Sequence, residues 1–236
     1  MGYVSGAVAN RVKQKWDVEY DMSQAVIRPY RAGDLNDLYR ICLLTGDGGN
    51  DATSMFEDPW ILGHVVAAPY GLFEPSLAFV AEDELGVGGY IVGALDSRAF
   101  ERRLEAEWWP ALRERYPAPP VELPHDQLTP DQRAARIIHA PLTVPDELAD
   151  EYPSHLHINL VPRLQSQGLG RRMMSTLMQA LRDFGSAGLH FFVMPTNQRA
   201  ADFYRHLGFT EIPREEGPLI FAMDLRPAGV RRAFAP

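Results

Sequence analysis

The stretch that decides the fold reads Gln165-Ser166-Gln167-Gly168-Leu169-Gly170-Arg171-Arg172, between a predicted strand at 155–161 and a predicted helix at 170–184. A helix start presents unpaired N–H groups and the positive end of the backbone dipole, and glycines let an anion approach the main chain closely. Residues 161–184 hold four arginines and one aspartate, a local charge of +3 in a chain of net charge −8. These features together predict a phosphate-binding turn.

Two other phosphate-binding loops fit this turn poorly. A P-loop requires Lys and then Ser or Thr after its second glycine, where this chain has two arginines. A dinucleotide-binding fingerprint requires a third glycine at the position of Met173. An ordinary strand-to-helix turn with two glycines is the remaining alternative when the turn is considered alone.

A second motif follows one strand later, in the run Asn197-Gln-Arg-Ala200-Ala-Asp-Phe203-Tyr204-Arg-His-Leu207-Gly208-Phe209. Asn197 is placed to cap a helix over 198–207, and Gly208 is placed to end it. Together, Gln165-x-x-Gly168-x-Gly170 and Asn197-x-x-Ala200-x-x-Phe203-Tyr204 resemble the acetyl-CoA-binding motifs of the GNAT superfamily of N-acetyltransferases. The conjunction of the two motifs is much more specific than either one.

A wider resemblance covers about residues 25–225. Ile27-Arg28-Pro29-Tyr30, the segment 93–96 and Trp108-Trp109 are similar to the acetyltransferase-like C-terminal domain of animal O-GlcNAcase. Members attached to the animal glycosidase have degenerate cofactor loops, whereas the glycine turn is intact here. The resemblance therefore implies a stand-alone bacterial relative that still binds acetyl-CoA.

The pattern of apolar residues and turn signals predicts the remaining elements. Pro110 must split its helix, because proline removes a backbone donor. The predicted elements are a strand at 26–29, a helix capped by Asp34, a helix at 55–67, a hairpin of 77–82 and 89–96, a helical insertion at about 98–154, and a βαβαβ unit ending at 224. The resulting fold class is α/β (α+β), a GNAT-like mixed, mostly antiparallel sheet with helices on both faces and the insertion between its third and fourth strands. We divide the chain into a lead-in (1–24), the acetyltransferase domain (25–225) and a tail (226–236).

The composition of the chain excludes several classes of protein and of binding site. Hydrophobic residues make up 46% of the chain and charged residues 23%, which is typical of a globular protein. No run of about 18 apolar residues and no secretion signal is present, so we expect a cytoplasmic protein that does not bind membranes. The net charge of −8 argues against general nucleic-acid binding. A single cysteine, Cys42, excludes an internal disulfide and multi-thiolate zinc sites, and we expect no metal.

In GNAT members the strand before the glycine turn and the strand after the helix splay apart, and the pantetheine arm of acetyl-CoA fills the gap. The resemblance implies that 160–163 is this edge and that the diphosphate lies over 167–172. The N–H of Val161 is the candidate for polarising the thioester oxygen. The expected cofactor-binding residues are Leu160, Val161, Arg163, Gln165, Gln167, Gly168, Leu169, Gly170, Arg171, Arg172, Asn197, Ala200, Phe203 and Tyr204.

Acetyl transfer to an amine needs one acid and one base. Tyr204 matches the tyrosine acid of the family. His155, His157 and Asn159 alternate along one face of their strand, so either histidine is a candidate base. Asp96, or Asp47 or Asp51 in the glycine loop, could hold a cationic acceptor, and ordered water could replace a protein base.

The sequence therefore predicts an acetyl-CoA-dependent N-acetyltransferase that acts by direct transfer on an amine of a small molecule, peptide or protein. The alternative is a catalytically inactive module that binds acyl-CoA or a protein. Trp108 and Trp109 could line an acceptor cleft, form a homodimer contact or fill a small core of the insertion, and we favour the last. Cys42 is expected to be a buried apolar residue. The acceptor and the oligomeric state stay open.

Overall fold

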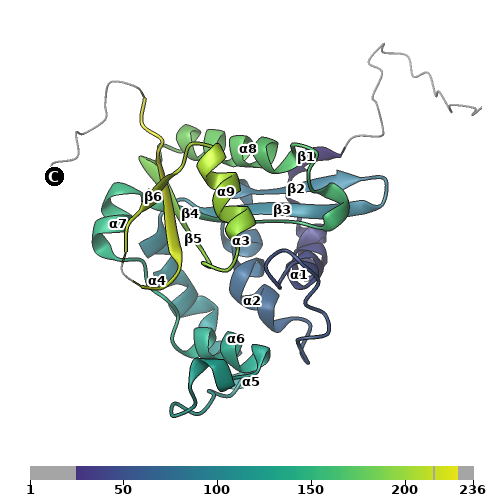
Figure 1. Ribbon diagram of the computed structural model, residues 1–236, viewed down its shortest axis with the longest axis vertical. Coiled ribbons are helices and arrows are strands. Elements are labelled where there is room, and N and C mark those ends of the chain that lie inside the picture. The colour runs from purple at the N-terminus through teal and green to yellow at the C-terminus, as the bar shows by residue number, and fades with distance from the viewer. Residues whose placement is uncertain (1–24, 215, 228–236) are drawn as a thin grey trace, which may run out of the picture.

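The computed structural model describes residues 25–214 and 216–227, and its centre is a seven-stranded sheet (Figure 1). The strands lie in the order β1-β2-β3-β4-β5-β7-β6, and every neighbouring pair is antiparallel except β4 with β5. Their bounds are β1 Val26–Pro29, β2 Ala78–Asp83, β3 Gly86–Ala94, β4 Ser154–Leu160, β5 Gly188–Val193, β6 Thr210–Ile212 and β7 Leu219–Asp224. The predicted fold class is confirmed, with β6 as an additional short strand.

Helices cover both faces of the sheet. Their bounds are α1 Leu35–Leu44, α2 Ile61–Val66, α3 Ala68–Phe73, α4 Ser97–Glu107, α5 Trp109–Arg115, α6 Pro130–His139, α7 Asp146–Glu151, α8 Leu169–Asp183 and α9 Gln198–His206. Leu177 of α8 lies against Gly93 of β3, whereas Tyr70 of α3 contacts His155 and His157 on the opposite face of β4. None of the helices in the described ranges is long and apolar enough to cross a membrane.

Helix α8 packs through an apolar stripe at helical spacing. Its residues Leu169, Met173, Leu177 and Leu181 are all buried, so this side of the helix fills the core. The helix ends at Asp183, and Phe184 just after it is 55% exposed.

The insertion between β3 and β4 packs onto the body of the domain. The helix divides at Trp108, and Pro110 is the second residue of α5, where its missing N–H has no helical partner to lose. Trp109 is 3% exposed and belongs to the main hydrophobic cluster, and the indole N–H of Trp108 donates to the carbonyl of His64 in α2 at 3.0 Å. The interpretation of a separate small core for the insertion is therefore wrong.

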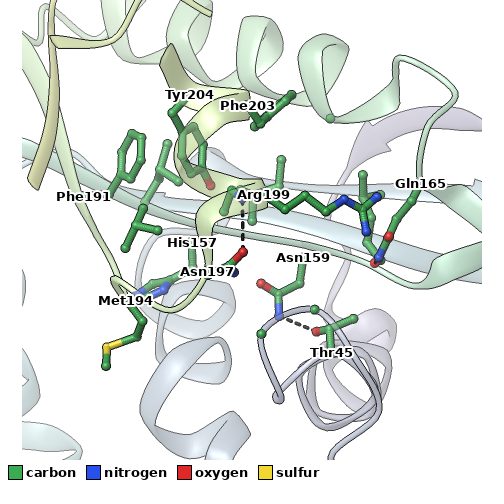
Figure 2. A pocket seen from close by; sticks show the side chains of 18 of the residues that line it. Thr45, His157, Asn159, Gln165, Phe191, Met194, Asn197, Arg199, Phe203 and Tyr204 are labelled. Atoms are coloured by element: carbon green, nitrogen blue, oxygen red, sulfur yellow. Dashed lines mark hydrogen bonds between the residues drawn. The ribbon is translucent and has the colours of Figure 1, made fainter. Parts of the chain in front are cut away.

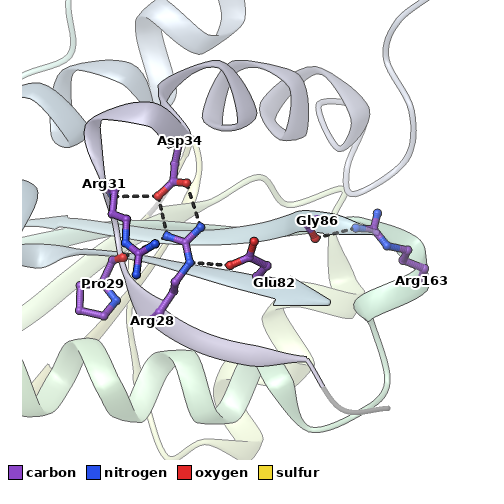
Figure 3. A network of polar contacts seen from close by, with 7 residues as sticks. All are labelled: Arg28, Pro29, Arg31, Asp34, Glu82, Gly86 and Arg163. Carbon is purple, nitrogen blue, oxygen red and sulfur yellow. Dashed lines mark hydrogen bonds and ion pairs between the residues drawn. The ribbon is translucent and has the colours of Figure 1, made fainter. Parts of the chain in front are cut away.

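A polar network ties β1 to α1 and β2 (Figure 3). Arg28 donates two hydrogen bonds, of 2.7 and 2.9 Å, to the carboxylate of Asp34, and its Nε donates to Glu82 at 2.6 Å. Asp34 also accepts the N–H of Arg31 at 2.8 Å. Asp34 stands at the N-cap position of α1 but makes no side-chain cap bond, because its oxygens serve Arg28 and Arg31. The hydrogen bonds from Arg28 lower the pKa of Asp34.

The segment before α2 departs from the predicted helix at 55–67. The carboxylate of Asp131 in α6 accepts the N–H groups of Glu57 and Asp58, and the Asp58 side chain accepts the N–H of Trp60. These bonds hold the backbone in turns, so α2 begins only at Ile61. Of the two predicted terminal segments, the lead-in and all but residues 226 and 227 of the tail lie outside the described residues.

Candidate active site

A cavity opens where β4 and β5 diverge. The two parallel strands pair only at Ser154 with Leu189 and His155 with His190. Beyond these pairs, residues 156–160 and 191–194 line a cavity of about 750 Å³ (Figure 2). The splayed strands predicted from the family resemblance are thus present, and α2, α8, α9 and the loop after α1 complete the walls.

Most of the predicted cofactor-binding residues meet at this cavity. Those that line it are Leu160, Gln165, Gly168, Gly170, Arg171, Asn197, Ala200, Phe203 and Tyr204. Those that do not are Val161, Arg163, Gln167, Leu169 and Arg172. Of the residues that do not line it, Val161 and Leu169 are buried in the main hydrophobic cluster.

The start of α8 has the geometry of an anion site. Gly168 has φ +74°, in the left-handed region that favours glycine. The carbonyl of Gly168 accepts the N–H of Arg172 at 3.1 Å, so the N–H groups of Leu169, Gly170 and Arg171 precede the first bond of the helical ladder. A Cβ at Gly170 would lie 3.2 Å from the Phe203 ring, so this glycine permits close packing of α8 on α9.

The arginines around this turn have different roles. Arg171 lines the cavity, whereas Arg172 beside it is exposed outside the lining. Arg163, predicted to bind cofactor, is directed to the β2–β3 turn, where its Nε pairs with Asp83 at 2.8 Å and a second nitrogen donates to the carbonyl of Gly86 at 3.2 Å (Figure 3). The local excess of positive charge in the sequence therefore overstates the charge that reaches the cavity.

The predicted donor to the thioester oxygen is wrong. The N–H of Val161 donates to the carbonyl of Gly88 at 2.9 Å, so it belongs to the β3–β4 ladder. Hydrogen bonding alternates along an antiparallel strand, which turns the N–H groups of Ile158 and Leu160 away from β3 and towards the divergent β5. Gln165 donates to the carbonyl of Leu160 at 2.7 Å and so joins the glycine turn to this free edge.

Tyr204 is placed as the sequence predicts. Its ring packs against Phe191, with ring centroids 4.3 Å apart, and its hydroxyl points into the cavity (Figure 2). Burial raises the pKa of the Tyr204 hydroxyl, so the phenol stays protonated at neutral pH. No hydrogen-bond partner within residues 25–214 and 216–227 occupies that hydroxyl, which leaves it able to donate to a bound molecule.

The two candidate histidines have different surroundings. His157 lines the cavity, and burial lowers its pKa to about 4. His155 does not line the cavity, because it lies deeper under α3 and α4: its Nε2 is bonded to the Tyr70 hydroxyl at 2.8 Å and its Nδ1 to the Ser97 hydroxyl at 2.7 Å. Both ring nitrogens of His155 are thus occupied, and it acts as a structural link and not as the predicted base.

The candidate aspartates lie elsewhere. Asp96 is exposed and caps α4 by accepting the N–H of Ala99 at 2.8 Å. Asp51 accepts the N–H of Thr53 at 2.8 Å, and neither Asp47 nor Asp51 lines the cavity. Within the described ranges, no Asp or Glu is part of the cavity wall. The positions predicted for holding a cationic acceptor therefore do not reach the place where it would react.

Several cavity residues were not predicted. The side-chain amide of Asn159 donates to the hydroxyl of Thr45, whose own proton goes to the carbonyl of Ile41 at 2.7 Å, and the Asn159 oxygen faces the cavity (Figure 2). The lining residues missed by the sequence analysis include Thr45, Leu62, Val66, Phe192, Met194 and Arg199. Cys42 touches the cavity but is buried, and burial raises the pKa of its thiol to about 12, so it is the inert residue that was expected.

Comparison with known proteins agrees with this geometry. The model of the acetyltransferase (GNAT) family matches residues 139–209. The crystal structure of SsHAT is similar at 34% sequence identity with a TM-score of 0.78, over 86% of this chain and 100% of that one. The chain belongs to the GNAT acetyltransferase family. Its membership supports acetyl-CoA as the cosubstrate, as predicted.

Two further proteins are similar to this chain at lower sequence identity. Protein O-GlcNAcase of Rattus norvegicus is 29% identical over 194 residues, which are 81% of this chain and 20% of that protein. The chain thus spans about a fifth of the length of this curated relative. The structure of yncA from Salmonella typhimurium with acetyl-CoA shares the GNAT fold at 14% identity and a TM-score of 0.52, over 89% of this chain and 99% of that one.

Proposed function

We propose that this GNAT protein transfers the acetyl group of acetyl-CoA directly to a primary amine. The observation that carries the proposal is a single cavity that joins the free N–H groups at the start of α8 to the unoccupied hydroxyl of Tyr204. The free edge of β4 runs between this anion site and the proton donor. An extended pantetheine arm can form hydrogen bonds to the main chain along that edge. Acetyl-CoA has a diphosphate, such an arm and a thioester in this order.

The start of α8 would hold the diphosphate. The N–H groups of Leu169, Gly170 and Arg171 supply neutral donors, and the helix dipole favours negative charge at this end. Arg171 from α8 and Arg199 from α9 add cationic side chains on either side. Figure 2 shows the guanidinium of Arg199 extended towards Gln165, across the upper part of the cavity.

The reaction consists of four changes in the reactants. The amine nitrogen forms a bond to the acetyl carbon, the carbon–sulfur bond breaks, the amine loses one proton and the departing sulfur gains one. Tyr204 donates the proton that the sulfur gains, because its hydroxyl is protonated and free. The N–H groups of Ile158 and Leu160 face the carbonyl oxygen as negative charge develops on it. His157 accepts a hydrogen bond from the amine, solvent takes up the proton that the amine loses, and Tyr204 regains a proton from solvent.

A second candidate function is binding of acyl-CoA without turnover. It is favoured by the absence of a carboxylate from the described cavity wall and by the low pKa of His157, which make a strong protein base unavailable. This candidate shares the cofactor site with the first and differs only in the chemistry. The two are therefore distinguished by turnover and not by affinity for acetyl-CoA.

The test is calorimetric titration with acetyl-CoA followed by an assay of thiol release over a panel of amines, with the acetylated products confirmed by mass spectrometry. We expect saturable binding and amine-dependent release of one thiol per product formed. Binding without any product would support the second candidate. Failure to bind acetyl-CoA at millimolar concentration would contradict both.

A further inference from the structure

One wall of the cavity lies outside the predicted cofactor motifs. We define this acceptor wall by six residues. They are Leu62 and Val66 of α2, His157 and Asn159 of β4, Phe192 of β5, and Met194 just after the end of β5. Figure 2 shows His157, Asn159 and Met194 on the side of the cavity opposite the α8 start. This wall is the part of the proposed transferase site that an acceptor would contact.

The acceptor wall exposes large apolar side chains. Phe192 is 43% exposed although both of its neighbours in β5 are buried, and Met194, just after the end of β5, is 61% exposed. Leu62 and Val66 contribute aliphatic groups from α2 to the same cavity. Apolar side chains that stay exposed in a cavity, and not singly on an outer surface, are typical of a binding site for an apolar ligand.

The charges around the cavity disfavour a cation. The described lining contains no carboxylate, in a chain with 31 Asp and Glu against 23 Lys and Arg, and its two cationic side chains, Arg171 and Arg199, belong to the proposed diphosphate site. An ammonium group that leaves water without a carboxylate partner loses hydration that nothing replaces. The scarcity of negative charge is thus local to the cavity and opposite to the composition of the whole chain.

The polar groups of the acceptor wall suit an uncharged amine. The Asn159 amide is fixed by its hydrogen bond to Thr45, which leaves its oxygen to accept an N–H from the cavity. His157 is a neutral imidazole, which can also accept an N–H. Two acceptors can orient an –NH₂ group and leave its lone pair free for attack. An amine that arrives uncharged also needs no strong base, and the cavity provides none.

We propose that the acceptor is a weakly basic primary amine attached to an apolar ring or chain, which binds uncharged, and not a polyamine or a lysine side chain. This inference rests on the proposed function, since it names the substrate class of that site. The amine would lie between Asn159 and His157, and its apolar body against Phe192 and Met194.

The test compares three amines that separate charge from apolar character. A 4-alkylaniline is uncharged and apolar, benzylamine is cationic and apolar, and spermidine is cationic and polar. We expect the kcat/KM for the aniline to exceed that for spermidine by at least about tenfold, with benzylamine between them. The reason is that a cationic amine finds no carboxylate partner in the cavity. A kcat/KM highest for spermidine would overturn the inference.

A matched pair of variants sharpens the test. Met194→Glu places a carboxylate at the exposed edge of the acceptor wall, and Met194→Gln has nearly the same size without the charge. We expect Met194→Glu to raise the spermidine-to-aniline ratio of kcat/KM about threefold to fivefold, as for a partly exposed ion pair, and Met194→Gln to leave it unchanged. Equal ratios in the two variants would show that charge at this wall does not select the acceptor.

The amines are also titrated onto the protein by ligand-observed NMR, with and without saturating CoA. This measurement separates the inference from the proposed function. Failure to bind acetyl-CoA would contradict the proposed function, and binding without turnover would contradict the proposed transfer. In either case, stronger binding of the aniline than of spermidine at the cavity would still support the inference. Stronger binding of spermidine would overturn it in either case.

Discussion

The two sides of the cavity are built in different ways. The cofactor side comes from two compact motifs within residues 165–204, which line the cavity with main chain, glycines and nearby polar and aromatic side chains. The acceptor wall comes from α2, β4 and β5, and the residues from Leu62 to Met194 meet only when the whole domain has folded. The comparison teaches that backbone-mediated binding is encoded locally, whereas side-chain selection of a substrate is encoded in tertiary structure.

Tyr204 stands where the two sides meet, and its substitution is expected to have the largest effect. Tyr204→Phe keeps the ring packed on Phe191 but removes the only proton donor proposed for the departing sulfur. We expect kcat to fall by about 100-fold or more, as for loss of a general acid, with the Kd for acetyl-CoA changed by less than about twofold. Stopped-flow thiol release and calorimetry measure the two quantities, and thermal unfolding provides the control for folding. An unchanged kcat would remove Tyr204 from the mechanism.

The sequence predicted the local geometry of the two cofactor motifs because they combine capping, glycine conformation and helical spacing, which are properties of neighbouring residues. Asn197 accepts the N–H of Ala200 at 3.1 Å and caps α9, and Gly208 has φ +86° just beyond its end, as expected. Gly168 and Gly170 are likewise where the motif places them. Such features do not depend on which strands pair.

Two of the errors concern residues whose partners are distant in sequence. The N–H of Val161 donates a hydrogen bond to the carbonyl of Gly88. The guanidinium of Arg163 pairs with the carboxylate of Asp83, about 80 residues earlier. Pairing register and the direction of long side chains decide both, and a single sequence shows neither. Arg199 was missed for the related reason that only the fold brings the start of α9 across from α8.

The second largest effect is expected at Gly168, which tests whether the local motif binds the cofactor. Gly168→Ala introduces a Cβ at φ +74°, where the surrounding space is open but the backbone conformation is strained. We expect a loss of roughly 1 kcal/mol of folding stability and a Kd for acetyl-CoA about tenfold higher, because the N–H groups of the turn shift when the strain is relieved.

Gly185 provides a matched control at the opposite end of α8. Its φ is +83°, and its added Cβ would also meet nothing within 4 Å. Gly185→Ala is therefore expected to lose a similar amount of stability in chemical denaturation while the Kd for acetyl-CoA stays the same. Equal loss of affinity in both variants would mean that general destabilisation, and not the anion site, controls binding.

A smaller effect is expected from two adjacent arginines. Arg171 lines the cavity and Arg172 does not, although both were predicted to bind cofactor. We expect Arg171→Ala to raise the Kd for acetyl-CoA about threefold to tenfold, as for one solvent-accessible charge-assisted hydrogen bond, and Arg172→Ala to change it by less than about twofold. Calorimetry at low and high salt measures both, and only the Arg171 variant should show a weakened salt dependence. Equal effects would indicate a diffuse field and not a defined contact.

The smallest expected effect is the pH dependence of the acceptor side, which distinguishes a neutral amine that binds at His157 from an ammonium that must first be deprotonated. Burial lowers the pKa of His157 to about 4, so the ring is neutral above this pH and becomes protonated only as the pH falls through it. With a 4-alkylaniline, kcat/KM should change by less than about twofold between about pH 5.5 and 7.5, where an ordinary histidine would titrate. A rising limb near pH 6.5 that His157→Asn abolishes would show that the imidazole titrates normally and acts as the base. In that case, the acceptor wall could activate cationic amines by deprotonation. It would then differ from the cofactor side by supplying a base and not by selecting uncharged amines.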